Sequence, residues 1–278
     1  MTNPGANTIL NQSDIDEIIR ATLAAETGAM PADFQASNVQ ISEMESDRQT
    51  NRFHRRFGET DPAFKAVTTG VGGVVSASGQ WVEAIRAIYD GVERDQIFEP
   101  AHMGQVADLA GKSGVMIFGP YPRFIAYPET IATGHIRKVP TVELLEGDPG
   151  DRFDLSDWPF ALTPNRQASR PVKAVSIARN GSKLIGLASI TADSAQLWQI
   201  GLDVVDDHRG KGVGTALTLA LAKFALDSDA VPYYGATAAN IPSIRTAISA
   251  GLKLAWMEVF SVPAERVHLR SLSAHWED

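Results

Sequence analysis

The chain has 278 residues, of which 44% are hydrophobic and 21% charged, which is the composition of a globular protein with one or two domains. A formal net charge of -8 argues against nucleic-acid or anionic-membrane partners, because both require a basic surface. The absence of cysteine excludes disulfides, thiolate catalysis and cysteine-ligated zinc. No secretory signal pattern opens the sequence and no segment is long and apolar enough to span a bilayer, so we expect a cytoplasmic protein.

The first half of the chain is predicted to open with a helix over residues 13–26, capped by Ser13. Its buried face would carry Ile15, Ile18, Ile19 and Thr22. The basic cluster RFHRRFG at residues 52–58 is typical of a solvated surface. Further along, the pattern predicts a strand over 71–78, helices over 81–91 and 100–114, and strands over 115–119 and 123–127.

A boundary is predicted near Gly134, which divides the chain into an N-terminal region, 1–133, and a C-terminal domain, 134–278. The clearest element after it is a hairpin around Asn180-Gly181, a dipeptide favoured in tight turns. The remaining pattern predicts strands over 137–148, 196–205, 231–238 and 254–262, a short helix over 151–162, and helices over 213–226 and 240–251.

A glycine-rich segment, RGKGVG at residues 209–214, lies between a predicted strand and a long apolar helix. It is not a dinucleotide-binding fingerprint, because Leu217 stands where the third glycine is required. The GKS tripeptide at 111–113 fails as a Walker A loop, because Val106 replaces its first glycine. Backbone N–H groups of a glycine-rich turn, the following helix N-terminus and the cations Arg209 and Lys211 together favour binding of a phosphate-bearing ligand.

The stretch VVDDHRGKGVGTALTLALAKFAL at residues 204–226 resembles the central motif of the GNAT superfamily of acyl-CoA-dependent N-acetyltransferases. The stretch ATAANIPSIRTAISAGLKLAW at 236–256 is similar to the later motif of that superfamily through Asn240, Ser243 and Gly251-Leu252. The resemblance covers about half the chain, roughly residues 134–262. It implies an α/β (α+β) fold with a mixed, mostly antiparallel sheet flanked by helices, acetyl-CoA as cosubstrate and no metal.

TADSAQLWQIGLDV at residues 191–204 resembles a two-part group of bacterial GNAT proteins of similar length, with a departure at Thr191. The order of the predicted elements over residues 70–127 suggests that the N-terminal α/β half is a degenerate GNAT-like unit without its own CoA loop.

The resemblance also implies which residues bind the donor. The loop and the first turn of its helix would grip the pyrophosphate of CoA, while the preceding strand and the next helix would bind the pantetheine arm. A backbone N–H near Val204 would face the thioester carbonyl and stabilise the oxyanion. The implied binding residues are Val204, Val205, Arg209, Gly210, Lys211, Gly212, Val213, Gly214, Thr215, Asn240 and Ser243.

The resemblance does not assign the general acid, because Ala247 occupies the position where many GNAT proteins carry a tyrosine general acid. Asp203 is predicted as the general base and Tyr234 as the proton partner of the thiol; a salt-bridged carboxylate and a packed strand aromatic are the alternatives. Substrate-binding residues are expected in and before the same strand, namely Asp193, Ser194 and Gln199.

The resulting hypothesis is an N-acetyltransferase, monomeric or homodimeric, that moves an acetyl group from acetyl-CoA to a primary amine of a small molecule. An enzyme that uses a different acyl donor and a non-catalytic CoA-binding sensor remain as alternatives.

Overall fold

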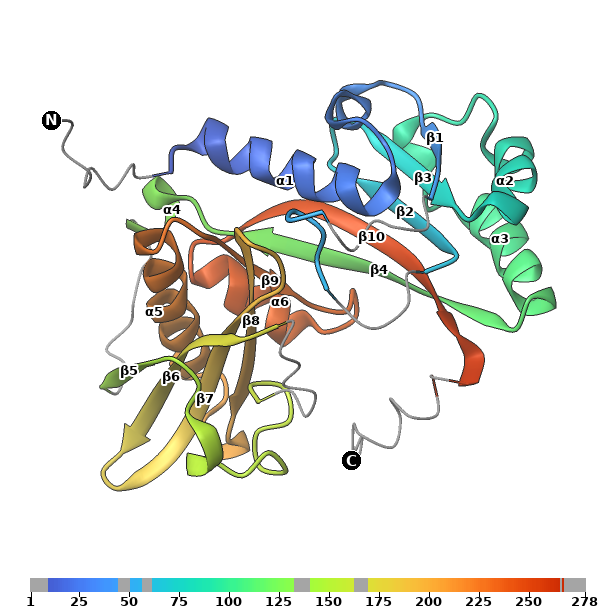
Figure 1. Ribbon diagram of the computed structural model, residues 1–278. Coiled ribbons are helices and arrows are strands. Elements are labelled where there is room, and N and C mark those ends of the chain that lie inside the picture. Colours follow the sequence, from blue (N-terminus) through green and yellow to red (C-terminus); the bar gives the residue numbers. More distant parts are fainter. Residues whose placement is uncertain are drawn as a thin grey trace, which may run out of the picture. The chain divides into compact units, whose positions relative to one another are not determined.

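Figure 1 shows the computed structural model, which describes residues 10–44, 51–56, 62–132, 141–162, 170–265 and 267. The chain forms two compact units. Unit 1 combines Met1–Ile19 with Phe124–Leu254, and unit 2 combines Arg20–Arg123 with Ala255–Asp278. Gly134 lies outside the described residues, so the division at 133/134 stays a prediction.

Helix α1, Gln12–Thr27, confirms the first predicted helix but begins with a different cap. The backbone N–H of Asp14 donates to Asn11 Oδ1 at 3.1 Å, and that of Asn11 donates to Asp14 Oδ2 at 3.0 Å. This reciprocal pair satisfies two backbone donors at once, so Asn11 is the N-cap and the prediction of Ser13 is wrong. The predicted apolar face is confirmed, because Ile15, Ile18, Ile19 and Thr22 are all buried.

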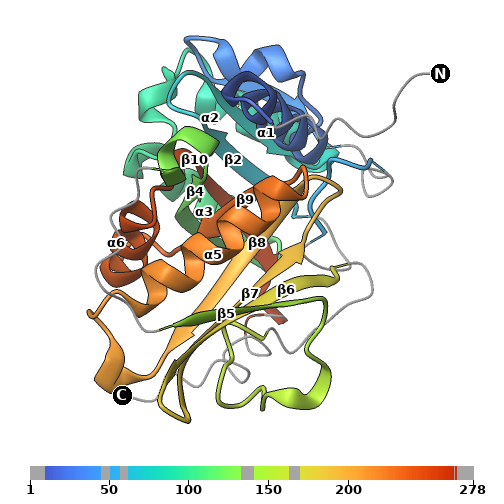
Figure 2. The ribbon, with the colours of Figure 1, turned by 90° about the vertical axis from the view of Figure 1, so that its left-hand side faces the viewer.

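The sheet of unit 1 has the strand order β9-β8-β7-β6-β5. Only the pair β8–β9 in this sheet is parallel. Figure 2 shows α5 lying across the strands, and α5 contacts β5 to β9. The strands and helices of this unit are β5 Val142–Glu146, β6 Val172–Asn180, β7 Lys183–Ala192, β8 Leu197–Val204, β9 Val231–Gly235, α4 Pro128–Ala132, α5 Val213–Asp227 and α6 Ile241–Ser249.

The predicted hairpin is β6–β7, but its turn is shifted by one residue. Asn180 pairs with Lys183, and Gly181, at φ +60°, and Ser182 form the two-residue turn. A turn whose first central residue needs positive φ selects glycine at that position. The hairpin is therefore confirmed, with Gly181 rather than Asn180 at the special backbone conformation.

The predicted helix over 151–162 is wrong. The segment has one 3-10 turn, Gly150–Arg152, followed by irregular turns. Its apolar side chains Trp158, Ala161 and Leu162 pack on the sheet together with Val175, Ile177 and Leu187. The apolar spacing therefore reflects a loop that covers the sheet.

Unit 2 is built on the strand order β1-β3-β2-β10-β4. The predicted strands 115–119 and 123–127 form one strand, β4, and the sequence patterns missed the short strands β1 and β2. The strands and helices of this unit are β1 Gln40–Glu43, β2 Phe64–Thr68, β3 Gly73–Ala77, β4 Val115–Ile125, β10 Lys253–Pro263, α2 Val82–Tyr89 and α3 Pro100–Lys112. The boundary residues Phe124, Ile125, Lys253 and Leu254 of β4 and β10 belong to unit 1.

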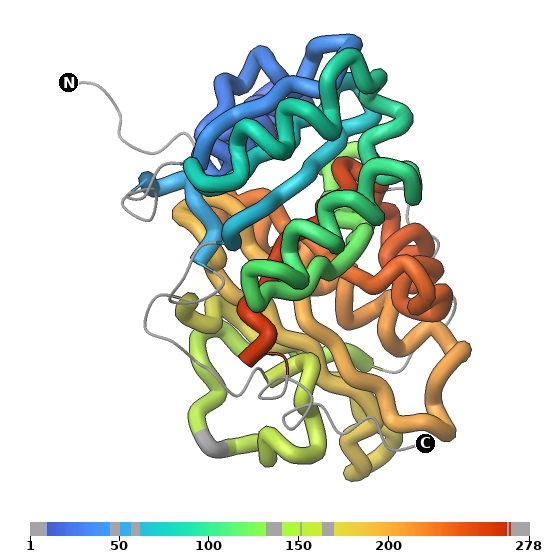
Figure 3. The backbone as a smooth tube through the Cα atoms, turned by 90° about the vertical axis from the view of Figure 1, so that its right-hand side faces the viewer, coloured from blue at the N-terminus to red at the C-terminus, as the bar shows by residue number. Residues whose placement is uncertain are grey.

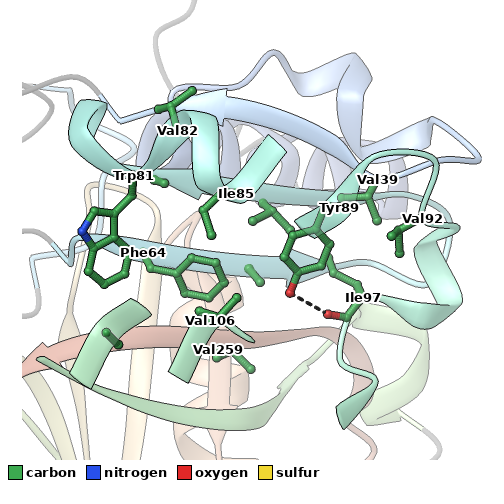
Figure 4. Close-up of a cluster of buried hydrophobic side chains, with 14 residues drawn as sticks. Val39, Phe64, Trp81, Val82, Ile85, Tyr89, Val92, Ile97, Val106 and Val259 are labelled. Atoms are coloured by element: carbon green, nitrogen blue, oxygen red, sulfur yellow. Dashed lines mark hydrogen bonds between the residues drawn. The ribbon is translucent and has the colours of Figure 1, made fainter. Parts of the chain in front are cut away.

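The apolar core of unit 2 lies between its strands and the helices α2 and α3, which lie side by side in Figure 3. Figure 4 shows the side chains of Phe64, Trp81, Ile85 and Tyr89 in this core. The Tyr89 hydroxyl donates to the Ile97 carbonyl at 3.2 Å, which satisfies its polar atom inside the apolar cluster. The prediction of a mixed, mainly antiparallel α/β fold is thus confirmed.

The basic cluster at residues 52–58 does not form a solvated surface throughout, because Arg55 is fully buried. Its guanidinium contacts Glu258 at 2.6 Å and Glu26 at 2.5 Å. Lys65 is paired with Glu26, and Arg123 contacts Glu258 at 2.7 Å. The prediction fails here because two buried carboxylates compensate the charge of Arg55. Residues 57 and 58 of the cluster lie outside the described part of the chain.

Candidate active site

Strand β8 pairs with its two neighbours over different lengths. Its antiparallel pairing with β7 continues to the pair Gly186 with Val204. Its parallel pairing with β9 ends earlier, at Ile200 with Tyr234, although β8 itself continues to Val204. β9 itself ends at Gly235, so the pairing stops after Ile200, and we call the edge of β8 that follows, residues 201–204, the opening.

The backbone of Val204 points to this opening. Val205 N–H donates to Ile185 O of β7 at 3.0 Å, and because backbone groups alternate along a strand, the neighbouring Val204 directs its own groups to the β9 side. Arg209 Nε donates to Val204 O at 3.1 Å on that side. The orientation agrees with the predicted oxyanion donor, whose role stays a prediction.

The glycine loop joins β8 to α5 through a 3-10 turn, Asp206–His208. Gly210 has φ +70° and Gly212 has φ +85°, a left-handed backbone region that other residues adopt at a cost. Gly212 is the N-cap of α5, and no side chain caps the helix there. The first N–H groups of α5, on Val213, Gly214 and Thr215, thus precede the first intrahelical bond, from Ala216 N to Gly212 O at 3.1 Å.

The two cations of the loop bond to the loop itself. Arg209 Nη2 contacts Asp206 Oδ1 at 2.9 Å, and Lys211 Nζ donates to Asp207 O at 2.6 Å. Both cationic residues are exposed, so each can exchange these contacts for an anion at little cost. Gly-rich backbone, helix N-terminus and exposed cations therefore occur together at the end of β8.

Helix α6 places Asn240 and Ser243 beside the end of β9. Asn240 Oδ1 accepts from Ser243 N at 3.1 Å, so Asn240 is the N-cap of this helix. Burial raises the pKa of the Tyr234 hydroxyl, and the nearby Ser243 side chain opposes that rise. The predicted proton partner thus lies next to a predicted pantetheine-binding residue.

Ala247 faces the interior of unit 1 and is fully buried. The methyl group at this position supplies no proton to a thiolate. The assignment of Tyr234 as the proton partner of the thiol stays a prediction.

Asp203 binds the loop that contains Phe160 and Ala161. This loop covers the face of β8 that lies away from α5. Its Oδ2 accepts from the backbone N–H of Phe160 at 2.8 Å and of Ala161 at 2.7 Å. Burial raises the pKa of the Asp203 carboxyl, while these two hydrogen bonds and the charge of Arg209 oppose the rise. The carboxylate thus fixes the position of the loop by two hydrogen bonds, and its role as general base stays a prediction.

Gly201 shows how closely this loop approaches the strand. A Cβ atom at Gly201 would lie 2.2 Å from the carbonyl oxygen of Phe160, so only glycine fits. The Phe160 side chain is exposed, which places an apolar ring beside the open end of β8. Sequence reasoning missed Phe160, because the helix predicted there gave no reason to bring it to the strand.

The three predicted substrate-binding residues differ in accessibility. Asp193 is fully buried and Ser194 nearly so, whereas Gln199 is half-buried. Asp193 is bonded to Arg170, Thr191 and Tyr233, and Ser194 Oγ accepts from Leu197 N. The burial of Asp193 and Ser194 argues against direct contact with a substrate, and their assignment stays a prediction.

Over the described ranges, no group of three or more His, Asp or Glu side chains is arranged to hold a metal ion. In those ranges, too, no helix is long and apolar enough to cross a membrane.

Residues 141–251, from β5 to α6, match the family model described as the acetyltransferase (GNAT) family. No curated protein matches the chain.

Several solved structures are similar to the chain at low sequence identity. A tandem GNAT protein from the clavulanic acid biosynthesis pathway is 12% identical, with 92% of this chain and 97% of that protein covered and a TM-score of 0.44. An acetyltransferase from the GNAT family of Colwellia psychrerythraea is 11% identical, with 52% and 57% covered and a TM-score of 0.40. A GCN5-related N-acetyltransferase from Kribbella flavida is 16% identical, with 56% and 62% covered and a TM-score of 0.37. The chain spans less than two thirds of the length of the latter two proteins.

Proposed function

We propose that this chain, which carries a domain of the GNAT acetyltransferase family over residues 141–251, transfers an acetyl group from acetyl-CoA to a primary amine of a small molecule. The family is one of acyltransferases; the acetyl donor and the amine acceptor are our proposal. The observation that carries it is the parting of β8 and β9 directly before the glycine loop. This geometry offers a strand edge to the pantetheine arm and an uncapped helix N-terminus to the pyrophosphate.

In this mechanism the acceptor amine attacks the thioester carbonyl, so a C–N bond forms and the C–S bond breaks. The Val204 N–H would stabilise the oxyanion, which is worth several kcal/mol for a well-placed donor. Asp203, directly or through water, would take the proton that the amine loses. Tyr234 would give a proton to the departing thiolate, which leaves as the free CoA thiol. The proton on Asp203 would then return to Tyr234 through solvent, which restores both side chains.

Two measurements test the proposal. Calorimetry should detect acetyl-CoA binding, and a screen of primary amines should reveal amine-dependent release of the CoA thiol. Absence of acetyl-CoA binding to the folded protein would overturn the proposal.

Ala247, which stands where many GNAT proteins carry a tyrosine general acid, favours a second candidate, a CoA-binding sensor without transferase activity. Tight acetyl-CoA binding with no thiol release from any amine would support this sensor. If the CoA thiol is released from a longer acyl-CoA but not from acetyl-CoA, the protein uses a different acyl donor.

A further inference from the structure

We propose that Gln199 is a specificity-determining residue, whose side-chain N–H donates a hydrogen bond to a carbonyl or carboxylate oxygen of the acceptor. This inference rests on the proposed function. It is carried by a chain of polar contacts on the face of β8 that also carries Asp203.

The first part of this chain is a carboxylate buried in unit 1. Asp193 is fully buried, and its Oδ2 accepts from the Tyr233 hydroxyl at 2.5 Å. Its Oδ1 accepts from Thr191 Oγ1 at 3.0 Å and from Arg170 Nε at 2.8 Å. Three donors compensate the desolvated charge, so the carboxylate holds the guanidinium in one place.

The second part is the contact between that guanidinium and a glutamine amide. Arg170 Nη2 donates to Gln199 Oε1 at 2.9 Å. A guanidinium has only donors, so the amide must present its oxygen to Arg170 and its NH₂ group away from it. The Arg170–Asp193 pair therefore assigns the orientation of the Gln199 amide.

The amide nitrogen of Gln199 is available to a ligand. Within the described part of the chain, no hydrogen bond involves Gln199 Nε2, and the residue is only half-buried. An oriented donor costs less rotamer entropy on binding than a freely rotating one. A site built to donate a hydrogen bond discriminates strongly against ligands that lack the matching oxygen.

The position of Gln199 bears on the size of the acceptor. Gln199 pairs with Tyr233, one residue before the last β8–β9 pair, so it lies next to the point where that pairing ends. Gln199 and Asp203 share a face four residues apart, which is roughly 13 Å along a strand. The Phe160 backbone packs on Gly201 between them, so an acceptor that reaches both side chains passes around Phe160 and carries its oxygen several bonds from its amine.

The acceptor series for the test consists of ω-amino amides from 4-aminobutyramide to 8-aminooctanamide, the corresponding ω-amino acids, and alkylamines of equal length. We expect kcat/KM for at least one amide or acid to exceed that of its alkylamine tenfold or more. A preference for the amides indicates that Gln199 binds a carbonyl oxygen of the acceptor, and a preference for the acids indicates a carboxylate oxygen.

Gln199→Glu is the decisive variant, because a carboxylate still accepts from Arg170 but no longer donates. We expect it to remove the tenfold preference for amides, to disfavour the acids further by charge repulsion, and to leave acetyl-CoA affinity unchanged. The matched control is Gln196→Glu, three residues earlier, which makes the same charge change and should keep the preference. A preference retained in Gln199→Glu, or absent in the unaltered protein, would overturn the inference.

The second readout does not depend on turnover. In a ¹⁵N-labelled protein the side-chain NH₂ signals of Gln199, assigned by their loss in Gln199→Glu, should shift with 6-aminohexanamide and not with hexylamine. If no amine is acetylated but this selective shift occurs, the proposed function fails and the binding site stands. If amines are acetylated but neither the preference nor the shift appears, the proposed function stands and the inference is wrong.

Discussion

Asp203 binds the backbone of the loop at Phe160 and Ala161 and is proposed as the general base, and substitutions distinguish these two roles. Asparagine can still accept from the N–H groups of Phe160 and Ala161 through its oxygen, but it cannot take a proton. We expect Asp203→Asn to lower the transfer rate at neutral pH and to approach the unaltered rate at high pH, where the amine is deprotonated without assistance. A pH–rate profile measures this. A profile identical to that of the unaltered protein would show that Asp203 only binds the loop and is not the general base.

The stability of the same variant has a defined sign. Because burial raises the folded-state pKa of Asp203, its carboxyl favours folding when protonated, and this contribution is lost as pH rises through that pKa. Asp203→Asn should therefore be no less stable than the unaltered protein at pH 7. Asp203→Ala deletes both hydrogen bonds and should cost about 1–3 kcal/mol in urea unfolding.

Gly212 tests the pyrophosphate site. Valine at this position adds a branched side chain to a loop that must approach an anion, and it strains a backbone at φ +85°. We expect Gly212→Val to weaken acetyl-CoA binding by tenfold or more, or about 1.4 kcal/mol, in calorimetry. Gly181→Val is the matched control, because it imposes similar strain at φ +60° in the β6–β7 turn, outside the glycine loop, and should leave the affinity unchanged.

At the scale of elements, helix α6 depends on one side chain for its start. Asn240 Oδ1 accepts from Ser243 N, and loss of such a cap costs about 1 kcal/mol. Asn240→Ala should therefore lower thermal stability, whereas Asn240→Ser keeps a cap. If Asn240 also binds pantetheine through its amide N–H, Asn240→Ser should weaken acetyl-CoA binding without loss of stability. If Asn240→Ser binds acetyl-CoA as tightly as the unaltered protein, Asn240 acts only as the helix cap.

At the scale of the whole molecule, the buried ion pairs make the stability of unit 2 sensitive to acid. The charges of Arg55 and Lys65 lower the pKa of Glu26 to about 2 against the rise that burial causes, and the same cations with Arg123 lower the pKa of Glu258. A lowered folded-state pKa contributes stability above the unfolded value, which is lost as pH falls toward the folded value.

We therefore expect the free energy of unfolding to fall as the pH decreases from about 4.5 toward 2. Glu26→Gln removes one of the two buried carboxylates that compensate Arg55 and Lys65 and should cost about 3–5 kcal/mol at pH 7. The control Glu83→Gln, at a side chain that is 92% exposed, should leave stability unchanged in the same denaturant titration. Similar acid sensitivity in Glu26→Gln and the unaltered protein would show that Glu26 does not cause it.

The sequence alone determined the helices and the hairpin whose signals lie within a few neighbouring residues. Apolar periodicity identified α1, α2, α3, α5 and α6, and the turn residues identified the β6–β7 hairpin. The resemblance of the glycine loop to the GNAT motif predicted the GNAT family. The family-model match over residues 141–251 supports this prediction. Local signals suffice for these features because backbone conformation and helix amphipathicity depend on neighbouring residues.

The tertiary structure alone decided which polar groups meet. Arg55 and Glu258 lie 203 residues apart in the chain, and Arg170 and Gln199 lie 29 apart, so no local pattern relates them. Asp203 likewise binds a loop that precedes it by more than 40 residues and that apolar spacing wrongly predicted as a helix. A charged side chain is buried only where folding brings its partners to it, because desolvation is too costly without them.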